Sequence, residues 1–304
     1  MEVHFYMKKR NVFSQKEAMI FNNFDLRQTK YRLTYWLLFL FMLILSIAII
    51  VPLIWTVMMG FKESSEIYAI PNSFFPKKFV FSSVSEAWKT LQIGRSIINT
   101  VAFAAGQIFF TVFVAALGGY VLSRLKPTGS SFVFALISFS MMLPGEVRVI
   151  PTFMELINLP LIGISLKNTY FSMWILAAAN AFNVLLFKNY FDSISISLIE
   201  AAKLDGCTNF KIFYKIVVPL SMPIIIFVAI SANNGAWGGF FWPMLMLDDT
   251  KKWILPLTLY KRSADTQLNL YFMGLTFSMI PTFLIFLIFQ KYIMGGINVG
   301  GVKG

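Results

Sequence analysis

Apolar residues along this sequence gather in long runs, and short charged segments separate the runs. Six runs reach roughly the 20 residues that an α-helix needs to cross the hydrocarbon core of a bilayer. The pattern therefore predicts an all-α membrane protein with six transmembrane helices. The six predicted spans are Trp36–Met59, Ile98–Leu122, Phe132–Pro151, Thr169–Phe187, Val217–Asn234 and Tyr271–Gln290.

Two of the predicted spans contain residues that disturb a straight helix. Pro144 and Gly145 interrupt the third span, and Pro219 and Pro223 lie near the start of the fifth. Proline removes a backbone donor and clashes with the preceding turn, although membrane helices tolerate it. We therefore expect an interruption in the third span and a bend in the fifth.

The composition strengthens the membrane assignment. Hydrophobic residues make up 57% of the 304 residues and charged residues 13%, whereas soluble proteins average roughly 45–50% and about 25%. With a mean hydropathy of +0.70, the chain has more apolar surface than one globule of this size can bury. The protein is therefore predicted to reside in a lipid membrane.

The scarcity of cysteine and histidine excludes several functions. Cys207 is the single cysteine and His4 the single histidine, so neither an intrachain disulfide nor a cysteine-based metal cluster can form. The same count excludes HExxH metallopeptidases and Ser-His-Asp triads. The sequence contains neither GxxxxGKS nor GxxxxGKT, so it has no ATP-binding P-loop of its own.

The charges between the spans predict an orientation. Segments on the side of the two termini hold 15 basic and 6 acidic residues, and segments on the opposite side hold 11 and 8. Basic residues concentrate on the cytoplasmic side of membrane proteins, so both termini are expected in the cytoplasm. This distribution explains the net charge of +12 better than nucleic-acid binding, and we expect no nucleic-acid partner.

Residues 1–35 form a basic N-terminal arm on the cytoplasmic side in this interpretation. The first apolar run begins only after this arm and ends in Met58 and Met59, which fits a secretory signal peptide poorly. The arm is compatible with an amphipathic helix on the inner membrane surface or with a partly disordered segment. The sequence alone leaves both alternatives open.

The predicted spans are almost free of charged side chains. Glu146 and Arg148, near the end of the third span, are the two exceptions. A charge at the bilayer centre costs about 2.5–3.5 kcal/mol on insertion scales, so such residues are kept mainly where function requires them. Proton-coupled carriers depend on buried carboxylates, and Glu146 is the single carboxylate in the predicted spans. An autonomous secondary carrier or a membrane enzyme is therefore the weaker hypothesis, and uphill transport would need an external source of energy.

The loop between the fourth and fifth spans predicts a short helix on the cytoplasmic side. Ser197 and Glu200 have the spacing of a capping box, and Gly206 supplies the left-handed residue that ends a helix. So short a helix is marginal alone in water, so its apolar face should pack against its own bundle or against a partner. The predicted apolar face consists of Leu198, Ile199, Ala202 and Leu204.

The wider spacing of this loop resembles a known family motif. The pattern E-A-A-x3-G-x9-I-x-L-P, the EAA loop, belongs to permease subunits of binding-protein-dependent ABC importers. Here a valine stands in the place of the leucine. The matching residues are Glu200, Ala201, Ala202, Gly206, Ile216, Val218 and Pro219. Two further stretches, Met141–Pro151 and Phe289–Gly304, are similar to segments of sugar-importer permeases, the second to the end of the smaller permease subunit of maltose-type systems.

The resemblance covers residues 36–304 and implies a six-span type I ABC importer permease domain, with the coupling-helix loop at residues 188–218. It implies three partners besides membrane lipid: a second, different permease subunit, a dimer of ATP-binding subunits and an extracytoplasmic solute-binding protein. The chain would be a non-catalytic subunit of a bacterial inner membrane complex, with no cofactor of its own, and the partner ATPases would bind ATP and Mg. The implied ATPase-coupling residues are Glu200, Ala201, Ala202, Asp205, Gly206, Lys303 and Gly304.

The resemblance also implies a solute, namely a sugar or oligosaccharide, with glycerol phosphate or another small solute as the alternative. A hydroxyl-rich solute needs hydrogen-bond partners that replace water and flat apolar faces. Each candidate below also has an ordinary structural explanation, because Asn joins membrane helices and Trp and Tyr lie at membrane interfaces. Candidate path residues are Asn180, Asn183, Asn233, Asn234, Gln107, Tyr170, Trp237 and Trp242. Candidate binding-protein contacts in the outer loop Leu247–Gln267 are Trp253, Leu255 and Tyr260.

Overall fold

The structure is a computed structural model that describes residues 29–160 and 162–296, and these residues form helices and no strand. The predicted all-α fold is thereby confirmed. The chain divides into two compact units, residues 1–58 and residues 59–304. His4 and the predicted coupling residues Lys303 and Gly304 lie outside the described residues.

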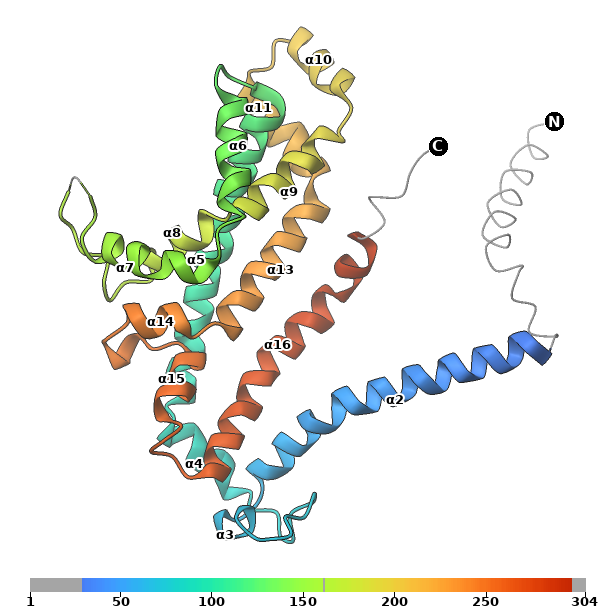
Figure 1. Cartoon of the computed structure of the whole chain (residues 1–304), viewed down its shortest axis with the longest axis vertical. Helices are drawn as coiled ribbons and strands as arrows, with labels where there is room; N and C mark the ends of the chain where they lie inside the picture. The colour runs from blue at the N-terminus through green and yellow to red at the C-terminus, as the bar shows by residue number, and fades with distance from the viewer. Residues whose placement is uncertain (1–28, 161, 297–304) are drawn as a thin grey trace. The chain divides into compact units, whose positions relative to one another are not determined.

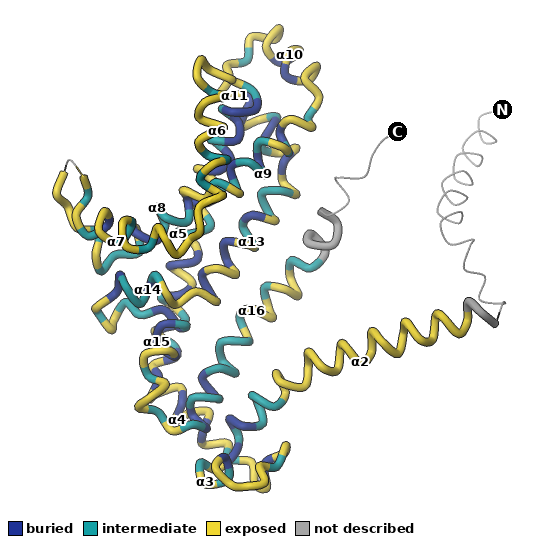
Figure 2. Tube along the Cα trace, in the orientation of Figure 1, coloured by how far each residue is buried: buried dark blue, intermediate teal, exposed yellow. Residues whose placement is uncertain are grey.

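The first unit is described by a single long helix. α2 spans Thr29–Gly60 and contains Pro52. Its most apolar stretch is exposed along its whole length (Figure 2). A helix that is apolar on all sides is stable only where lipid or other protein segments surround it. α2 therefore has the composition and the exposure of a membrane helix.

The second unit is built around α5, Ile93–Tyr120, which continues into the π-helical segment η1, Val121–Leu125. α8, α9 and α13 pack along α5. Glycine allows one close approach, because a Cβ at Gly119 would lie 2.7 Å from the Cβ of Phe187 in α9. The three packed helices span Phe171–Ala178, Ala181–Asp192 and Met222–Gly238.

Several of the predicted spans are bent pairs of helices. α6, Ser130–Ser140, meets the segment Gly145–Ile157, made of η2 and α7, at 105° after the break at Pro144. α8 and α9 meet at 47°. The segment Asn209–Leu220, made of α11, η3 and α12, meets α13 at 78°. The interruption of the third span and the bend in the fifth, which the sequence predicts, are both confirmed.

The number of spans depends on these bent pairs. Three single helices are long and apolar enough to cross a bilayer, namely Arg32–Gly60, Ile93–Leu125 and Leu268–Gln290. The described chain has six spans if each bent pair crosses the membrane once. The six-span topology therefore stays a prediction that the lengths permit. The third of the long helices belongs to α16, Leu268–Gly296.

The two ends of the second unit carry different short elements. α10, Ile196–Leu204, lies at one end, and α4 and α15 lie at the opposite end (Figure 1). One buried cluster joins α10 to α5, α9 and the helices before α13, and a second joins α4, α15 and α16. A third cluster surrounds Phe103 of α5 between them. The remaining elements span Ser64–Ile67 (α3), Ser82–Thr90 (α4), Phe241–Met246 (α14), Thr250–Lys252 (η4) and Leu255–Arg262 (α15).

Candidate functional site

The start of α10 differs from the predicted capping box. Ser195 is the N-cap residue, and its side chain caps no backbone amide. The Ser195 and Ser197 hydroxyls are 2.7 Å apart and bond to each other. The capping box requires Ser197 at the N-cap position, with Glu200 bonding to the Ser197 amide, but the helix begins at Ile196, so Ser197 lies inside its first turn. The capping-box prediction is therefore wrong, although a helix is present.

The end of α10 follows the prediction. Gly206 has φ +74°, a left-handed conformation that costs glycine little. Its amide bonds to the Lys203 oxygen at 3.0 Å, and the Cys207 amide bonds to the Ala202 oxygen at 3.0 Å. These two bonds form a Schellman motif, which satisfies the last carbonyls of the helix.

α10 is held by two residues and exposes the rest. Ile199 and Ala202 are 5% and 6% exposed and pack in the cluster that contains Tyr120. Leu198 and Leu204, which the sequence assigned to the same apolar face, are 50% and 89% exposed. The prediction of a four-residue buried face is therefore wrong, because only Ile199 and Ala202 of these residues pack against the rest of the unit. The outward side of α10 carries the other predicted coupling residues, all of them exposed: Glu200, Ala201, Asp205 and Gly206.

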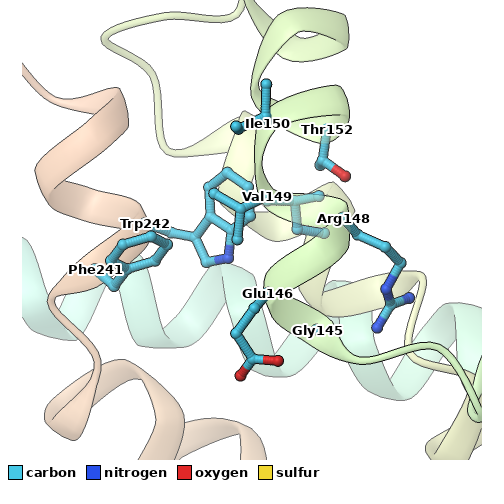
Figure 3. A pocket seen from close by; sticks show the side chains of 9 residues that line it. Gly145, Glu146, Arg148, Val149, Ile150, Thr152, Phe241 and Trp242 are labelled. Carbon is cyan, nitrogen blue, oxygen red and sulfur yellow. The ribbon is translucent and has the colours of Figure 1, made fainter.

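A cavity of about 780 Å³ opens between the η2–α7 segment and α14, with Leu176 of α8 in its wall. Figure 3 shows Phe241 and Trp242 of α14 opposite this segment, and the side chains of Glu146 and Arg148 extend in different directions. The cavity thus combines two aromatic rings, one hydroxyl and both charged residues of the predicted spans. Its lining residues are Gly145, Glu146, Arg148, Val149, Ile150, Thr152, Leu176, Phe241 and Trp242.

A second cavity of about 260 Å³ adjoins the first, because the two share Leu176, Phe241 and Trp242. Phe103 and Gln107 of α5 line its wall. The Gln107 side-chain amide donates a 3.1 Å hydrogen bond to the Ala232 oxygen of α13. The Gln107 amide nitrogen therefore joins α5 to α13, and the same side chain also borders the cavity.

Two of the predicted path residues, Gln107 and Trp242, line these cavities. Trp237 is 9% exposed and packs in the cluster of α4, α15 and α16. The Tyr170 hydroxyl donates a 2.8 Å hydrogen bond to the Lys252 oxygen, and its ring borders a different cavity. Packing between elements therefore accounts for both side chains, and neither lines the two cavities described above.

The four predicted asparagines line neither cavity. Asn180 is the N-cap of α9, and its Oδ1 accepts a 3.1 Å hydrogen bond from the amide of Asn183. This capping role explains Asn180 without a solute. Asn233 is 7% exposed inside the unit, whereas Asn234 is exposed on α13.

The three predicted binding-protein contacts differ in exposure. Leu255 is fully buried, and its amide donates a 2.8 Å hydrogen bond to Thr100 Oγ1. Because a fully buried side chain cannot touch a binding protein, the prediction for Leu255 is wrong. Trp253 is half-buried and donates to the Leu247 oxygen at 3.3 Å. Tyr260 is 47% exposed and stacks on Phe240 with 4.4 Å between ring centroids.

Glu146 and Arg148 are absent from the predicted path residues, yet both line the larger cavity. The signal that could have found them was present, because charged residues are rare inside membrane spans and mark functional positions by default. The break at Pro144 is what turns this stretch away from α6 and into the cavity wall.

Residues 107–298 match the family described as "Binding-protein-dependent transport system inner membrane component". The chain belongs to this family. The probable ABC transporter permease protein YurM of Bacillus subtilis is 34% identical over 87% of each chain. The arabinooligosaccharides transport system permease protein AraQ of Halalkalibacterium halodurans is 28% identical over 88% of this chain and 96% of that protein.

The fold of this inner membrane component also occurs in a solved structure. A chain of a bacterial ABC transporter involved in the import of the acidic polysaccharide alginate has a TM-score of 0.76 and 24% identity, and the match covers 87% of this chain and 98% of that one. The likeness extends the family relationship to the arrangement of the helices. The matched segment of the family includes Gln107, in the wall of the smaller cavity, and all of α10.

Proposed function

We propose that this inner membrane component is a permease subunit of an ATP-driven importer that takes up a sugar or oligosaccharide from an extracytoplasmic binding protein. The observation that carries the proposal is the relationship to AraQ, a permease named for arabinooligosaccharides, along nearly the whole of both chains. The family description, which names a binding-protein-dependent transport system, supports the source of the solute. The chain itself is non-catalytic in this proposal.

Partner ATPases supply the energy and contact the permease through α10. The exposed side of α10 offers Ala201, which is small enough for close approach, and the acidic residues Glu200 and Asp205, which can pair with basic groups. Exposed Leu198 and Leu204 add apolar area that a protein groove would cover. ATP and Mg are bound by those ATPases, and the tail at Lys303 and Gly304 contributes a further contact. The basic residues of this side favour a cytoplasmic position for α10 and both termini.

A second permease subunit completes the pathway. This chain supplies only part of the wall of the larger cavity, which Trp242 lines. The most apolar stretch of α2 is also exposed. Lipid and a partner permease together would cover these surfaces. In this proposal residues 36–304 form the permease domain, and residues 1–35 form the basic arm that precedes it. Closure of the ATPase dimer would then switch the two permeases between inward- and outward-facing arrangements.

The cavity residues suit a hydroxyl-rich solute. The rings of Phe241 and Trp242 offer flat apolar faces for the carbon side of a sugar ring, and Thr152 and Glu146 offer hydrogen-bond partners. Because Arg148 shares the cavity with Glu146, the charge of the wall is mixed. We propose this cavity as part of the solute path and Tyr260 and Trp253 as contacts of the binding protein.

Reconstitution tests the proposal. The permease is placed in liposomes with its cognate partner permease, ATPase and binding protein, and uptake of radiolabelled arabinooligosaccharide, alginate oligosaccharide and glycerol 3-phosphate is measured with and without ATP. We expect ATP-dependent uptake of an oligosaccharide. Uptake of glycerol 3-phosphate alone would support the alternative solute, and uptake by the isolated chain without ATPase would overturn the proposal.

A further inference from the structure

Arg124 lies in η1, at the end of α5, beside the turn that joins α9 to α10. One nitrogen of its guanidinium, Nη2, donates hydrogen bonds to the backbone oxygens of both Phe191 and Ile194. Phe191 is in the last turn of α9, and Ile194 directly precedes Ser195, the N-cap of α10. The two hydrogens of Nη2 have fixed directions in the plane of the guanidinium fork. Arg124 therefore holds the backbone on both sides of the α9–α10 turn in one geometry.

A second polar contact ties the same elements together. Asp192, the last residue of α9, accepts a 2.6 Å hydrogen bond from Ser123 of η1 and a 2.7 Å bond from Lys188. Ser123 is 3% exposed, and the Lys188 ammonium lies 5.2 Å from the ring centroid of Phe134 in α6. Hydrogen bonds to charged groups are about twice as strong as neutral ones. The end of α5 is thus joined to α9 at two neighbouring positions.

The other side of the α10 loop is attached to α5 as well. The Tyr120 hydroxyl donates a 3.2 Å hydrogen bond to the oxygen of Asn209, the first residue of α11. The centroid of the Tyr120 ring also lies 4.9 Å from that of the Phe213 ring. α10 is therefore held at its entry by Arg124, at its exit by Tyr120, and along its inner face by the buried Ile199 and Ala202.

The same helix reaches the proposed solute path. α5 runs from the α10 end to Phe103 and Gln107, which line the smaller cavity. Trp174 of α8 donates a 2.9 Å hydrogen bond to the Phe103 oxygen, so the cavity wall is fixed to α5 there. A movement of α10 that carries η1 and α5 with it therefore reaches the cavity wall along one continuous helical segment.

We propose that Arg124 is a positioning residue that makes α10, the end of α9 and α5 move as one body, so that a displacement of α10 by its partner is transmitted to the cavity. Without the Arg124 fork, the three residues 193–195 form a turn that can flex while α10 moves. The proposal rests on the proposed function, because it takes the ATPase as the partner of α10. Ser123 and Asp192 support the same attachment.

The experiment measures transmission directly and needs no knowledge of the transported sugar. In the full complex, Thr152→Cys in a Cys207→Ser background places one reporter thiol in the larger cavity. Its rate of labelling by a membrane-impermeant methanethiosulfonate reagent is measured with and without ATP, together with ATP hydrolysis and retention of the ATPase. We expect ATP to change the rate by about fivefold or more in the parent, as for typical coupled sites.

Arg124→Ala is expected to retain the ATPase and to hydrolyse ATP, while the ATP-dependent change in labelling falls below about twofold. Arg124→Lys keeps the charge without the fork, so its response should be intermediate. Arg95→Ala is the matched control, because Arg95 lies near the opposite end of α5 and contacts Gln92 of its own helix start. It should respond as the parent does.

The outcomes separate the two proposals. A parent complex that neither binds the ATPase nor responds to ATP overturns the proposed function. A parent that responds, with Arg124→Ala responding equally, overturns the role of Arg124 and leaves the proposed function standing. If Arg124→Ala does not assemble, Arg124→Lys decides, since a full response in that variant contradicts the need for the fork.

Discussion

At the residue scale, two glycines carry different requirements. Gly206 needs its backbone freedom, because its φ is +74°. Space is not the constraint there, since a Cβ would meet nothing within 4 Å. Gly119 needs the absence of a side chain, because a Cβ would lie 2.7 Å from the Phe187 Cβ. The first ends a surface helix, whereas the second sets the distance between α5 and α9. Substitutions at the two positions should therefore fail in different ways.

Gly206→Asp should leave folding and membrane insertion intact and release the ATPase. A left-handed conformation costs a side chain about 1–2 kcal/mol, and Asp and Asn tolerate it best. Because Gly206 is exposed at the end of α10, the added volume and charge face the proposed partner. Gly206→Asn is the control with a similar backbone cost and no charge. Co-purification of the ATPase and uptake measure the effect, and normal ATPase retention with normal uptake in Gly206→Asp would contradict the coupling role of α10.

Gly119→Ala should destabilise the second unit by about 1–3 kcal/mol, the range for overpacking a close contact. The new methyl group would also lie 2.8 Å from the backbone nitrogen of Lys188, so α9 must move away. Gly118→Ala is the matched control, since its Cβ would lie 3.3 Å from a methyl carbon of Val184, which can adjust. Thermal unfolding in detergent measures both. Equal midpoints for the two variants would show that α5 and α9 pack less closely than described.

At the element scale, prolines and turn residues predicted where helices break and end, whereas side-chain patterns were less successful in predicting which residues are buried. The interruption at Pro144, the bend before α13 and the end of α10 at Gly206 follow from backbone rules that act locally. The start of α10 and its buried face did not, because neighbouring helices decide which positions of a short helix are covered. The cavity was also unpredictable in part, since it forms where the segment after Pro144 meets α14, far away in sequence.

The cavity makes α14 the element to test for solute contact. Trp242→Ala removes an aromatic face from both cavities, and ring contacts contribute about 0.5–1.5 kcal/mol, equivalent to about 2–10-fold in affinity. We expect uptake in the reconstituted system to need a correspondingly higher concentration of loaded binding protein, and Trp242→Phe to retain most of the activity. ATPase retention should be normal in both variants. Unchanged uptake by Trp242→Ala would remove α14 from the proposed path.

At the scale of the whole molecule, charge and exposure together favour one orientation in the membrane. The side with the larger basic excess is the side of α10, and the opposite side carries Trp253 and Tyr260. α10 can meet an ATPase only if it faces the cytoplasm, where ATP is present. Orientation is therefore the property on which the coupling proposal, the solute path and the binding-protein contact all depend.

Labelling of single cysteines in sealed, right-side-out vesicles measures this orientation. In a Cys207→Ser background, Leu204→Cys places a thiol on the exposed side of α10, where the native side chain is 89% exposed. Asp248→Cys places one in an exposed position of the outer loop. A membrane-impermeant maleimide should label the Asp248→Cys variant at once and the Leu204→Cys variant only after the vesicles are opened. The reverse pattern would place α10 outside the cell, where no ATPase could reach it, and the larger basic excess on the α10 side would then contradict the usual preference of basic residues for the cytoplasm.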